Sequence, residues 1–278
     1  MKPEYEINIG ICGFGFVGNA IYNYLEKLDL FNIIIYDKYK TIVNVNNDSI
    51  DSFEDLLKCH IIYLCLPTLY DENIKSYNMD EINNSLELLS NYNYDGLILI
   101  KSTILPDYCE SVNNKYNNLH IFHNPEFLSA KTASEDFANQ KQIIIGYTSQ
   151  SEKYNYIIDK FYKILFPDVP INITNSKESA LTKLACNSFY ATKVQFFSEL
   201  YLLCNKLELS YNNVKELMLN NGWINQMHTN VPGHDGLISF GGACLPKDIS
   251  ALNQYMKELS VPNEVINSTI NERNKMRI

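Results

Sequence analysis

The sequence predicts an α/β fold: a doubly wound parallel sheet followed by an all-α domain with one long helix. Two observations in the first half carry this prediction. Short apolar runs alternate with helical patterns, and a glycine-rich turn joins the first run to the first helical pattern. Near residue 175 the apolar residues change to three- and four-residue steps, which indicates helices. We therefore expect two domains, residues 1–174 and residues 175–278.

The apolar runs of the first domain are expected to be strands buried on both faces. They are rich in isoleucine and lack strict alternation with polar residues, as is typical of parallel strands covered by helices. The runs are Ile7–Cys12, Ile33–Tyr36, Ile61–Leu66, Leu97–Ile100, His120–Phe122 and Ile143–Ile145. Between the first two, Val17–Leu28 carries its apolar residues on one helical stripe, which predicts a right-handed βαβ crossover.

The second domain is expected to start with an unusually long helix. Asn175 is a candidate N-cap with Glu178 at the third helical position, and neither Pro nor Gly occurs from there to about Leu207. Such a helix would be about 50 Å long. Its apolar residues spread around the circumference, as is typical of a helix buried between domains or subunits. Further helices are expected at 212–220, 248–258 and from Asn263 to the end.

Composition excludes several classes of function. The 278 residues include 23 Lys+Arg and 32 Asp+Glu, and the net charge of −9 argues against nucleic acid or an anionic membrane as a partner. No apolar run reaches the roughly 18 residues that span a bilayer, and the first residues lack a signal-peptide core. The seven cysteines are scattered without a CxxC pair, so we expect no metal site, no disulfide framework and a cytoplasmic location.

The segment Gly13–Gly18 (GFGFVG) is a dinucleotide-binding fingerprint. It follows a predicted strand and opens a helix, and an acidic residue ends the next strand. Gly13 permits the tight turn, and Gly18 lets the helix pack on the strand. Gly15 lets a pyrophosphate approach the positive helix N-terminus, where Phe16 and Val17 also lie. These residues predict a Rossmann domain, and the alternative is an ordinary strand–helix turn.

Asp37 is the acidic residue that completes this fingerprint. Its carboxylate is expected to accept hydrogen bonds from the adenosine ribose and to repel a 2′-phosphate. NAD is therefore the expected cofactor, rather than NADP. The adjacent Lys38 weighs the other way, because a neighbouring cation can tolerate a phosphate.

Four other segments hold candidate residues for chemistry. Cys244 follows two glycines and precedes Asp248 by four residues, so it is either a nucleophile or a small buried residue. Lys183 and Asn187 share a helix face, either as oxyanion donors or as a solvated edge. Lys101-Ser102-Thr103 and His123–Leu128 follow predicted strands, where ligands of open α/β sheets bind. The alternatives are an N-cap for Thr103 and a solvated loop for Glu126.

Together these segments resemble the family of nucleotide-sugar dehydrogenases that includes UDP-glucose 6-dehydrogenase and GDP-mannose dehydrogenase. The resemblance is ordered and covers nearly the whole chain. The segments that carry it are GFGFVG, Leu66-Pro67-Thr68, KST at 101–103, NPEFL at 124–128, Glu178–Asn187 and FGGACLPKD at 240–248.

The resemblance implies an NAD-dependent oxidation of the C6 alcohol of a nucleotide sugar to a carboxylate, with UDP-glucose as the expected substrate. Cys244 would form a thiohemiacetal and then a thioester. Lys183 and Asn187 would stabilise oxyanions, and Asp248 would position water with Thr103 nearby. Glu126 would assist thioester hydrolysis.

The resemblance also implies binding roles. Pro67, Thr68 and Thr103 would lie near the cofactor, to which Lys38 is a candidate neighbour through its position next to Asp37. The sugar nucleotide would contact Glu126, Phe127, Leu128, Lys183, Asn187, Gly241 and Gly242. The long helix would form a homodimer, and the product would serve polysaccharide biosynthesis.

Three departures from the family pattern stand out. Ala130 occupies a position where family members often have a second Glu, and the usual basic residue before FGG is absent. Family members also carry a C-terminal domain that holds much of the sugar nucleotide, and these 278 residues do not include it. The alternatives are therefore a non-catalytic NAD-binding relative that acts with a partner chain, or another two-domain dehydrogenase such as a β-hydroxyacid dehydrogenase.

Overall fold

A computed structural model describes residues 7–40 and 52–277. The polypeptide divides into two units: residues 1–69 with 78–183, and residues 70–77 with 184–278. No helix in the described ranges combines the length and hydropathy that crossing a bilayer requires.

The first unit contains a sheet of seven described strands in the order β2-β1-β3-β6-β7-β8-β9. They are β1 (Ile7–Cys12), β2 (Phe31–Tyr36), β3 (Ile61–Leu64), β6 (Leu97–Ile100), β7 (His120–His123), β8 (Ile143–Tyr147) and β9 (Ile171–Asn175). The first five strands in this order pair in parallel. This confirms the predicted α/β fold. The six predicted runs match six of these strands with ends shifted by at most two residues, and β9 was not predicted.

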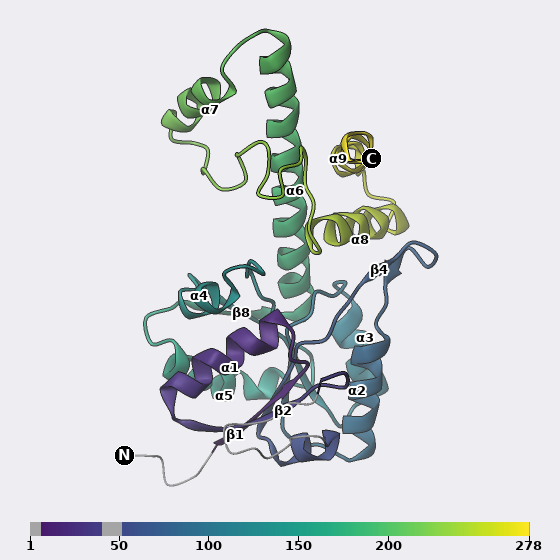
Figure 1. Cartoon of the computed structure of the whole chain (residues 1–278). Helices are drawn as coiled ribbons and strands as arrows, with labels where there is room; N and C mark the ends of the chain where they lie inside the picture. Colours follow the sequence, from purple (N-terminus) through teal and green to yellow (C-terminus); the bar gives the residue numbers. More distant parts are fainter. Residues whose placement is uncertain (1–6, 41–51, 278) are drawn as a thin grey trace. The chain divides into compact units, whose positions relative to one another are not determined.

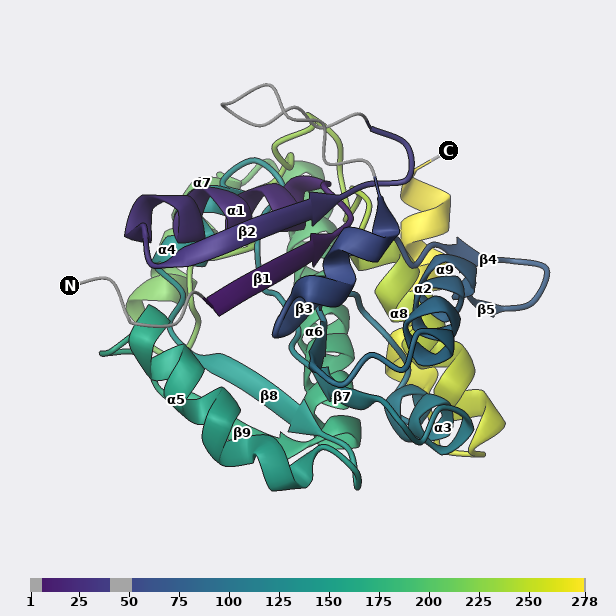
Figure 2. The ribbon, with the colours of Figure 1, turned by 90° about the horizontal axis from the view of Figure 1, so that it is seen from below.

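Helices cover both faces of this sheet, as the continuous apolar runs predict (Figure 2). On one face lie α1 (Phe16–Leu28), α4 (Ala133–Ala138) and α5 (Asn155–Leu165), and on the other lie η1 (Phe53–Lys58), α2 (Asp80–Asn91) and α3 (Tyr108–Lys115). A short 3₁₀ turn, η2 (Glu152–Tyr154), precedes α5. Fully buried residues such as Ile21 and Leu86 stabilise the two faces by about 1.5–3 kcal/mol each.

One pairing differs from the expected parallel sheet: β8 runs antiparallel to β7 through Phe122–Tyr147 and His123–Gly146. The Ile143–Ile145 run is buried, as expected of a strand covered on both faces. Such a pattern reports burial on both faces and carries no information on strand direction, so the sequence could not distinguish the two.

The parallel strands place four chain segments at one edge of the sheet. The carboxyl ends of β1, β3, β6 and β7 lie at the same edge, and the chain continues there into Gly13, Cys65–Thr68, Lys101–Thr103 and Asn124–Glu126. The strand order reverses at β1, because β2 lies on one side of it in the sheet and β3 lies on the other. In open α/β sheets this reversal is where ligands bind.

The second unit is helical (Figure 1). The helix α6 (Ser176–Lys206) starts in the first unit and continues into the second, which also holds α7 (Tyr211–Asn220), α8 (Leu245–Glu258), α9 (Glu264–Met276) and a hairpin of β4 (Tyr70–Asp71) and β5 (Ser76–Tyr77). The predicted long helix is confirmed as α6. The predicted cap is confirmed as well, because the Glu178 N–H donates to Asn175 Oδ1 over 2.9 Å.

Two small cores hold the second unit together. Ala191 on α6 packs with Phe240 and with Ile249 on α8, and residues of α9 join this core. Farther along α6, Phe197 and Cys204 pack against Tyr211 of α7. The segment between α7 and α8 is thereby attached to α6, and this segment carries the loop that leads to Cys244.

Candidate functional site

The turn after β1 has the backbone geometry that the fingerprint requires. Gly13 has φ +94°, and a Cβ there would stand 2.6 Å from the Cys65 carbonyl oxygen, so only glycine fits without strain. A Cβ on Gly18 would stand 2.1 Å from the Gly13 carbonyl oxygen. Gly15, by contrast, has open space where its Cβ would be, and it directly precedes α1. The backbone is therefore accessible at the N-terminus of a helix.

The start of α1 is electrostatically suited to a phosphate. The first turn, which begins at Phe16 and Val17, contains no acidic side chain, so the positive end of the helix dipole is not neutralised there. An open glycine at a helix N-terminus is what a pyrophosphate needs, and these residues fit a dinucleotide.

Asp37 directly follows β2 and contacts this turn. Its Oδ2 accepts from the Phe14 N–H over 2.7 Å, and its Oδ1 accepts from the Tyr39 N–H over 2.9 Å. These bonds fix the carboxylate at the position where the fingerprint needs a ribose acceptor, and its lone pairs have capacity for further donors. Lys38 pairs with Glu81 at 2.9 Å, which directs its ammonium to a carboxylate of this chain.

The segments after β3 and β6 are joined by hydrogen bonds. Thr68 is buried, and its hydroxyl donates to the Thr103 carbonyl over 2.8 Å. The Leu66 N–H donates to the Ser102 hydroxyl, which itself donates to the Leu66 carbonyl. Pro67 is exposed between these contacts. Thr103 is not an N-cap, because α3 starts only at Tyr108.

Lys101 is a buried cation next to this junction. Its Nζ donates to Asn124 Oδ1 over 2.8 Å, and burial lowers its pKa to about 8. The Asn124 Nδ2 donates in turn to the Ile144 carbonyl. Lys101 therefore fixes the start of the 124–128 loop.

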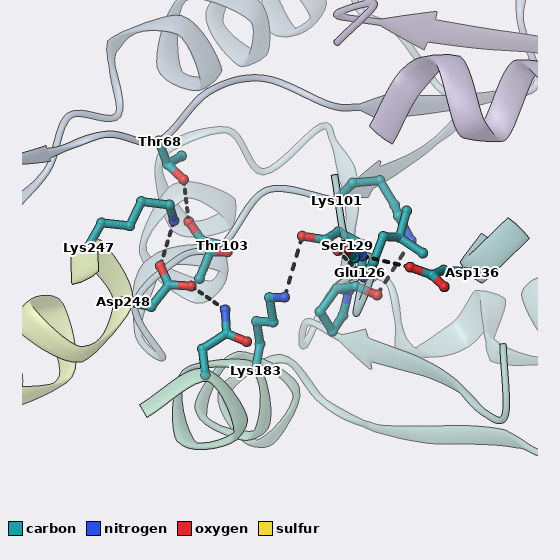
Figure 3. Close-up of polar contacts among 12 residues, drawn as sticks. Thr68, Lys101, Thr103, Glu126, Ser129, Asp136, Lys183, Lys247 and Asp248 are labelled. Atoms are coloured by element: carbon teal, nitrogen blue, oxygen red, sulfur yellow. Dashed lines mark hydrogen bonds and ion pairs between the residues drawn. The ribbon is translucent and has the colours of Figure 1, made fainter. Parts of the chain in front are cut away.

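Glu126 and Lys183 form a buried ion pair in the first unit (Figure 3). The Lys183 Nζ lies 3.4 Å from Glu126 Oε1, and the two side chains are 4% and 8% exposed. The ammonium also lies 5.0 Å from the centre of the Phe127 ring, and the Leu128 N–H donates to Glu126 Oε2. Glu126 is thus not a solvated loop carboxylate, and Lys183 is not a solvated helix edge.

Asp248 is the most buried carboxylate of the second unit, with no exposed area. It accepts from the Tyr77 hydroxyl, from Asn187 Nδ2 and from Lys247 Nζ, each over 2.5 Å. Figure 3 shows the contact with Lys247. Burial and the adjacent carboxylate raise the pKa of Tyr77 well above its ordinary value, so its hydroxyl stays protonated as a donor.

The loop before α8 carries the candidate nucleophile. Cys244 is half-buried at the N-terminus of α8, and the Asp248 N–H donates to its carbonyl over 3.0 Å. A helix N-terminus stabilises a thiolate. Gly242 has φ +78° with open space around its Cβ position, whereas the space at Gly241 is filled by the Arg277 guanidinium.

The structure therefore gathers the candidate residues into separate groups. One group comprises the turn Gly13–Gly18 and Asp37. A second comprises Glu126, Phe127, Leu128 and Lys183, and a third comprises Asn187 and Asp248 one helical turn after Cys244. Within the described part of the chain, no cluster of three or more His, Cys, Asp or Glu is arranged to hold a metal ion.

Sequence reasoning missed three contributors. Tyr77 lies on the β4–β5 hairpin, which the sequence patterns did not predict, and it is 171 positions from its partner Asp248. Lys101 and Lys247 stood inside recognised motifs, but only their burial and partners indicate a role. A charged residue directly after a buried strand was the available signal for Lys101.

Comparisons with known proteins agree across both units. Residues 49–166 match the NAD binding domain of the UDP-glucose/GDP-mannose dehydrogenase family, and residues 177–275 match its central domain. The UDP-glucose 6-dehydrogenase of Rickettsia typhi is 34% identical over 66% of this chain, and that of Rickettsia felis is 28% identical over 98%. The chain spans 42% and 65% of the length of these two relatives.

A solved structure shares this fold. The structure of a UDP-glucose dehydrogenase from Pyrobaculum islandicum superposes with a TM-score of 0.83 at 18% identity, covering 99% of this chain and 69% of that one.

Proposed function

Because the chain belongs to the UDP-glucose/GDP-mannose dehydrogenase family, we propose that it oxidises the C6 alcohol of a nucleotide sugar to a carboxylate, with NAD as cofactor and UDP-glucose as substrate. One observation carries the proposal furthest. Cys244 stands one helical turn before the buried Asp248, which binds Asn187. This arrangement places a nucleophile next to a held carboxylate and an amide.

The cofactor is assigned to the turn Gly13–Gly18. Gly15 gives the pyrophosphate access to the backbone, and Asp37 accepts from the ribose hydroxyls. NAD, when bound, accepts the hydrides that leave the sugar carbon, one for each two-electron oxidation. Thr68 and Thr103 fix the adjacent strand ends, which shapes the nicotinamide end of the site.

Cys244 is assigned as the nucleophile. The first oxidation converts the alcohol into an aldehyde, and the thiolate adds to the aldehyde carbon to give a thiohemiacetal. The second oxidation leaves a thioester. Water then attacks the thioester carbon, the C–S bond breaks, and the thiol is restored as the carboxylate leaves. The reactive aldehyde is never released.

Lys183 and Asn187 are assigned as oxyanion donors, one helical turn apart on α6. The Lys183 ammonium has three donor hydrogens and pairs with Glu126, so it can donate to a developing oxyanion as well. The Asn187 amide donates one hydrogen to Asp248 and has a second. Preorganised donors of this kind stabilise a transition state by about 3–4 kcal/mol each.

Asp248 and Glu126 are assigned to the hydrolysis of the thioester. Asp248 is held by three donors, so its carboxylate cannot reorient, and it is suited to positioning a water molecule. By resemblance to the family, Glu126 is assigned to assist this hydrolysis, with Thr103 as a further candidate. Ala130 stands where family members often have a second Glu, so the hydrolysis is assigned to Asp248 and Glu126.

An alternative is a non-catalytic relative that binds NAD and acts with a partner chain. The chain spans 42% and 65% of the length of the two relatives. The buried Lys183–Glu126 pair and the held Asp248 favour the catalytic proposal, because burying charges without a task is costly. We also propose a cytoplasmic setting, because the seven cysteines form no disulfide.

The deciding experiment measures NADH absorbance with UDP-glucose, UDP-N-acetylhexosamines and GDP-mannose, each with NAD or NADP. We expect NADH with UDP-glucose and NAD, in a ratio of two NADH per sugar, and little turnover with NADP. Calorimetry of NAD and of each sugar nucleotide is the control. A folded preparation that binds NAD yet forms no NADH with any sugar would contradict the activity, and NAD binding without sugar-nucleotide binding would favour the alternative.

A homodimer through α6 is proposed from its exposed apolar stripe. Phe189, Phe196 and Leu203 are 64%, 54% and 53% exposed, and they recur every seven residues along one side of the helix. Large apolar side chains in such a row are typical of a surface that another copy covers.

The dimer proposal predicts a change of mass. Phe189→Glu with Phe196→Glu should convert a dimer of roughly twice the chain mass into a monomer in light scattering, because two buried charges would face each other at the interface. Ile157→Glu, on α5 and 52% exposed, is the matched control and should leave the mass unchanged. A monomeric wild-type chain would refute the proposal.

A further inference from the structure

Only two arginines occur in the sequence, Arg273 and Arg277, against many lysines. They are four residues apart, Arg273 in the last turn of α9 and Arg277 directly after it, and both contact the loop 235–241. This loop leads into Gly242 and Cys244. Both arginines contact the same loop, which indicates that a guanidinium makes contacts there that a lysine ammonium cannot make.

Arg277 binds the loop at three points. Its Nε donates to the Ile238 carbonyl over 2.9 Å, its Nη2 donates to the Ser239 carbonyl over 2.8 Å, and the same Nη2 pairs with Asp235 at 2.8 Å. The side chain is only 12% exposed. Two carbonyls and a carboxylate need donors in one plane, which the planar guanidinium fork has and the lysine ammonium lacks.

Arg273 adds a second contact one turn earlier. Its Nε donates to the Phe240 carbonyl over 3.3 Å, and its guanidinium carbon lies 5.8 Å from the centre of the Phe240 ring. The backbone carbonyls of three consecutive residues, 238–240, are thus held by the two arginine side chains.

Gly241 gives space to this clamp. A Cβ on Gly241 would stand 2.1 Å from Arg277 Nη1 and 2.7 Å from its guanidinium carbon. The absent side chain therefore leaves room for the guanidinium, and Gly241 has no left-handed φ that would itself demand glycine.

The opposite side of the loop is held by α6. The Ser239 N–H donates to the Ser198 hydroxyl over 2.9 Å, and the Ser239 hydroxyl donates to Gln195 Oε1. Ser239 has φ +66°, a left-handed conformation that a non-glycine residue adopts only when its surroundings hold it. The arginines supply the holding contacts on the α9 side.

We propose that Arg277, assisted by Arg273, is a positioning residue that fixes the loop 235–242 and thereby the approach to Cys244, and that Gly241 is glycine to admit the guanidinium. The kinetic part of this inference rests on the proposed function, and the structural part does not.

The structural test is hydrogen exchange of the loop measured by mass spectrometry on the full chain. In Arg277→Ala and in Gly241→Ala, amides of residues 236–243 should exchange at least about tenfold faster than in the wild type. Arg277→Lys should be intermediate, because it keeps the charge but loses the planar fork. Lys275→Ala is the control, since Lys275 is 70% exposed and pairs with Glu272 on its own helix.

Gly241→Ala keeps the test valid if Arg277→Ala loosens α9 itself, because the substitution lies in the loop and leaves α9 unchanged. Loop exchange within about twofold of wild type in both variants would overturn the proposal.

The kinetic test separates positioning from a general loss of structure. Arg277→Ala should lower kcat at least about tenfold while KM for NAD stays within about twofold, because the cofactor turn is unaffected. Guanidinium ion added at low concentration should restore part of kcat, and equal sodium chloride should not. Loss of kcat without rescue would contradict the positioning role. If the wild-type chain turns over no sugar, the proposed function fails, and the exchange data still decide the clamp.

Discussion

Replacing Cys244 by alanine is expected to lower formation of the carboxylate product from a nucleotide sugar by at least about a thousandfold. The expectation follows from the chemistry of the second oxidation. An aldehyde cannot lose a hydride to give an acyl product until a nucleophile has added to its carbon, and in the proposed reaction that nucleophile is the thiolate. Without it, turnover should stop after one NADH per sugar, with aldehyde as the product.

Serine at the same position tests the nucleophile more closely. Cys244→Ser keeps the size of the side chain and its place at the N-terminus of α8, but a hydroxyl is far less ionised than a thiol at neutral pH. We expect a loss of at least about a hundredfold and an ester intermediate that hydrolyses more slowly than a thioester. Mass spectrometry of quenched wild-type enzyme should find the acyl group on the Cys244 peptide.

Cys186→Ser is the matched control. Cys186 is half-buried like Cys244 and lies on α6 beside Tyr190, and the proposed reaction assigns it no role. Its substitution should leave the rate within about twofold. Equal losses in Cys186→Ser and Cys244→Ala would show that thiol loss in general destabilises the chain. Two NADH per sugar from Cys244→Ala would refute covalent catalysis.

The fold was predictable because each local pattern agreed with the next. Continuous Ile-rich runs report strands buried on both faces, and the open Gly13–Gly18 turn reports a helix N-terminus at the end of the first strand. The uninterrupted segment after Asn175 reported the long helix and its cap. The direction of β8 and the β4–β5 hairpin were not predictable, because burial carries no direction and the hairpin strands have two residues each.

The sequence motifs predicted which residues belong to the site but not which of them contact each other. Recognition of residues 124–128 and 178–187 gave both members of the Glu126–Lys183 pair, yet nothing local linked them across 57 positions. Tyr77 and Arg277 act through contacts with residues 171 and 38 positions away. Such contacts are fixed by the packing of whole elements, which a single sequence does not display.

The Glu126–Lys183 pair leads to the prediction with the largest effect on stability. Lys183→Met should destabilise the first unit by about 3–5 kcal/mol, because it leaves the Glu126 carboxylate buried without its partner charge. Glu126→Gln should also destabilise, since it leaves a buried ammonium. The loss in free energy of unfolding is large because both side chains are buried, and it does not depend on the 3.4 Å distance between the charged atoms.

The exposed pair Lys163–Asp159 is the matched control for this reasoning. Its atoms are closer, at 2.6 Å, but Lys163 is 62% exposed, so water screens the interaction. Lys163→Met should shift the melting temperature by no more than about 1 °C. Circular dichroism is the suitable probe, because the single tryptophan, Trp223, belongs to the second unit and cannot report on the first.

The double variant Lys183→Met with Glu126→Gln separates stability from activity. Removing both charges leaves no unpaired ion, so most of the melting temperature that Lys183→Met loses should return, with a coupling of at least about 2 kcal/mol. Activity should not return, because Lys183 is also the proposed oxyanion donor. A double variant as unstable as Lys183→Met would show that the lysine stabilises through packing on Phe127 rather than through its charge. A fully active double variant would remove both residues from the proposed mechanism, and the chemistry would then rest on Cys244, Asn187 and Asp248 alone.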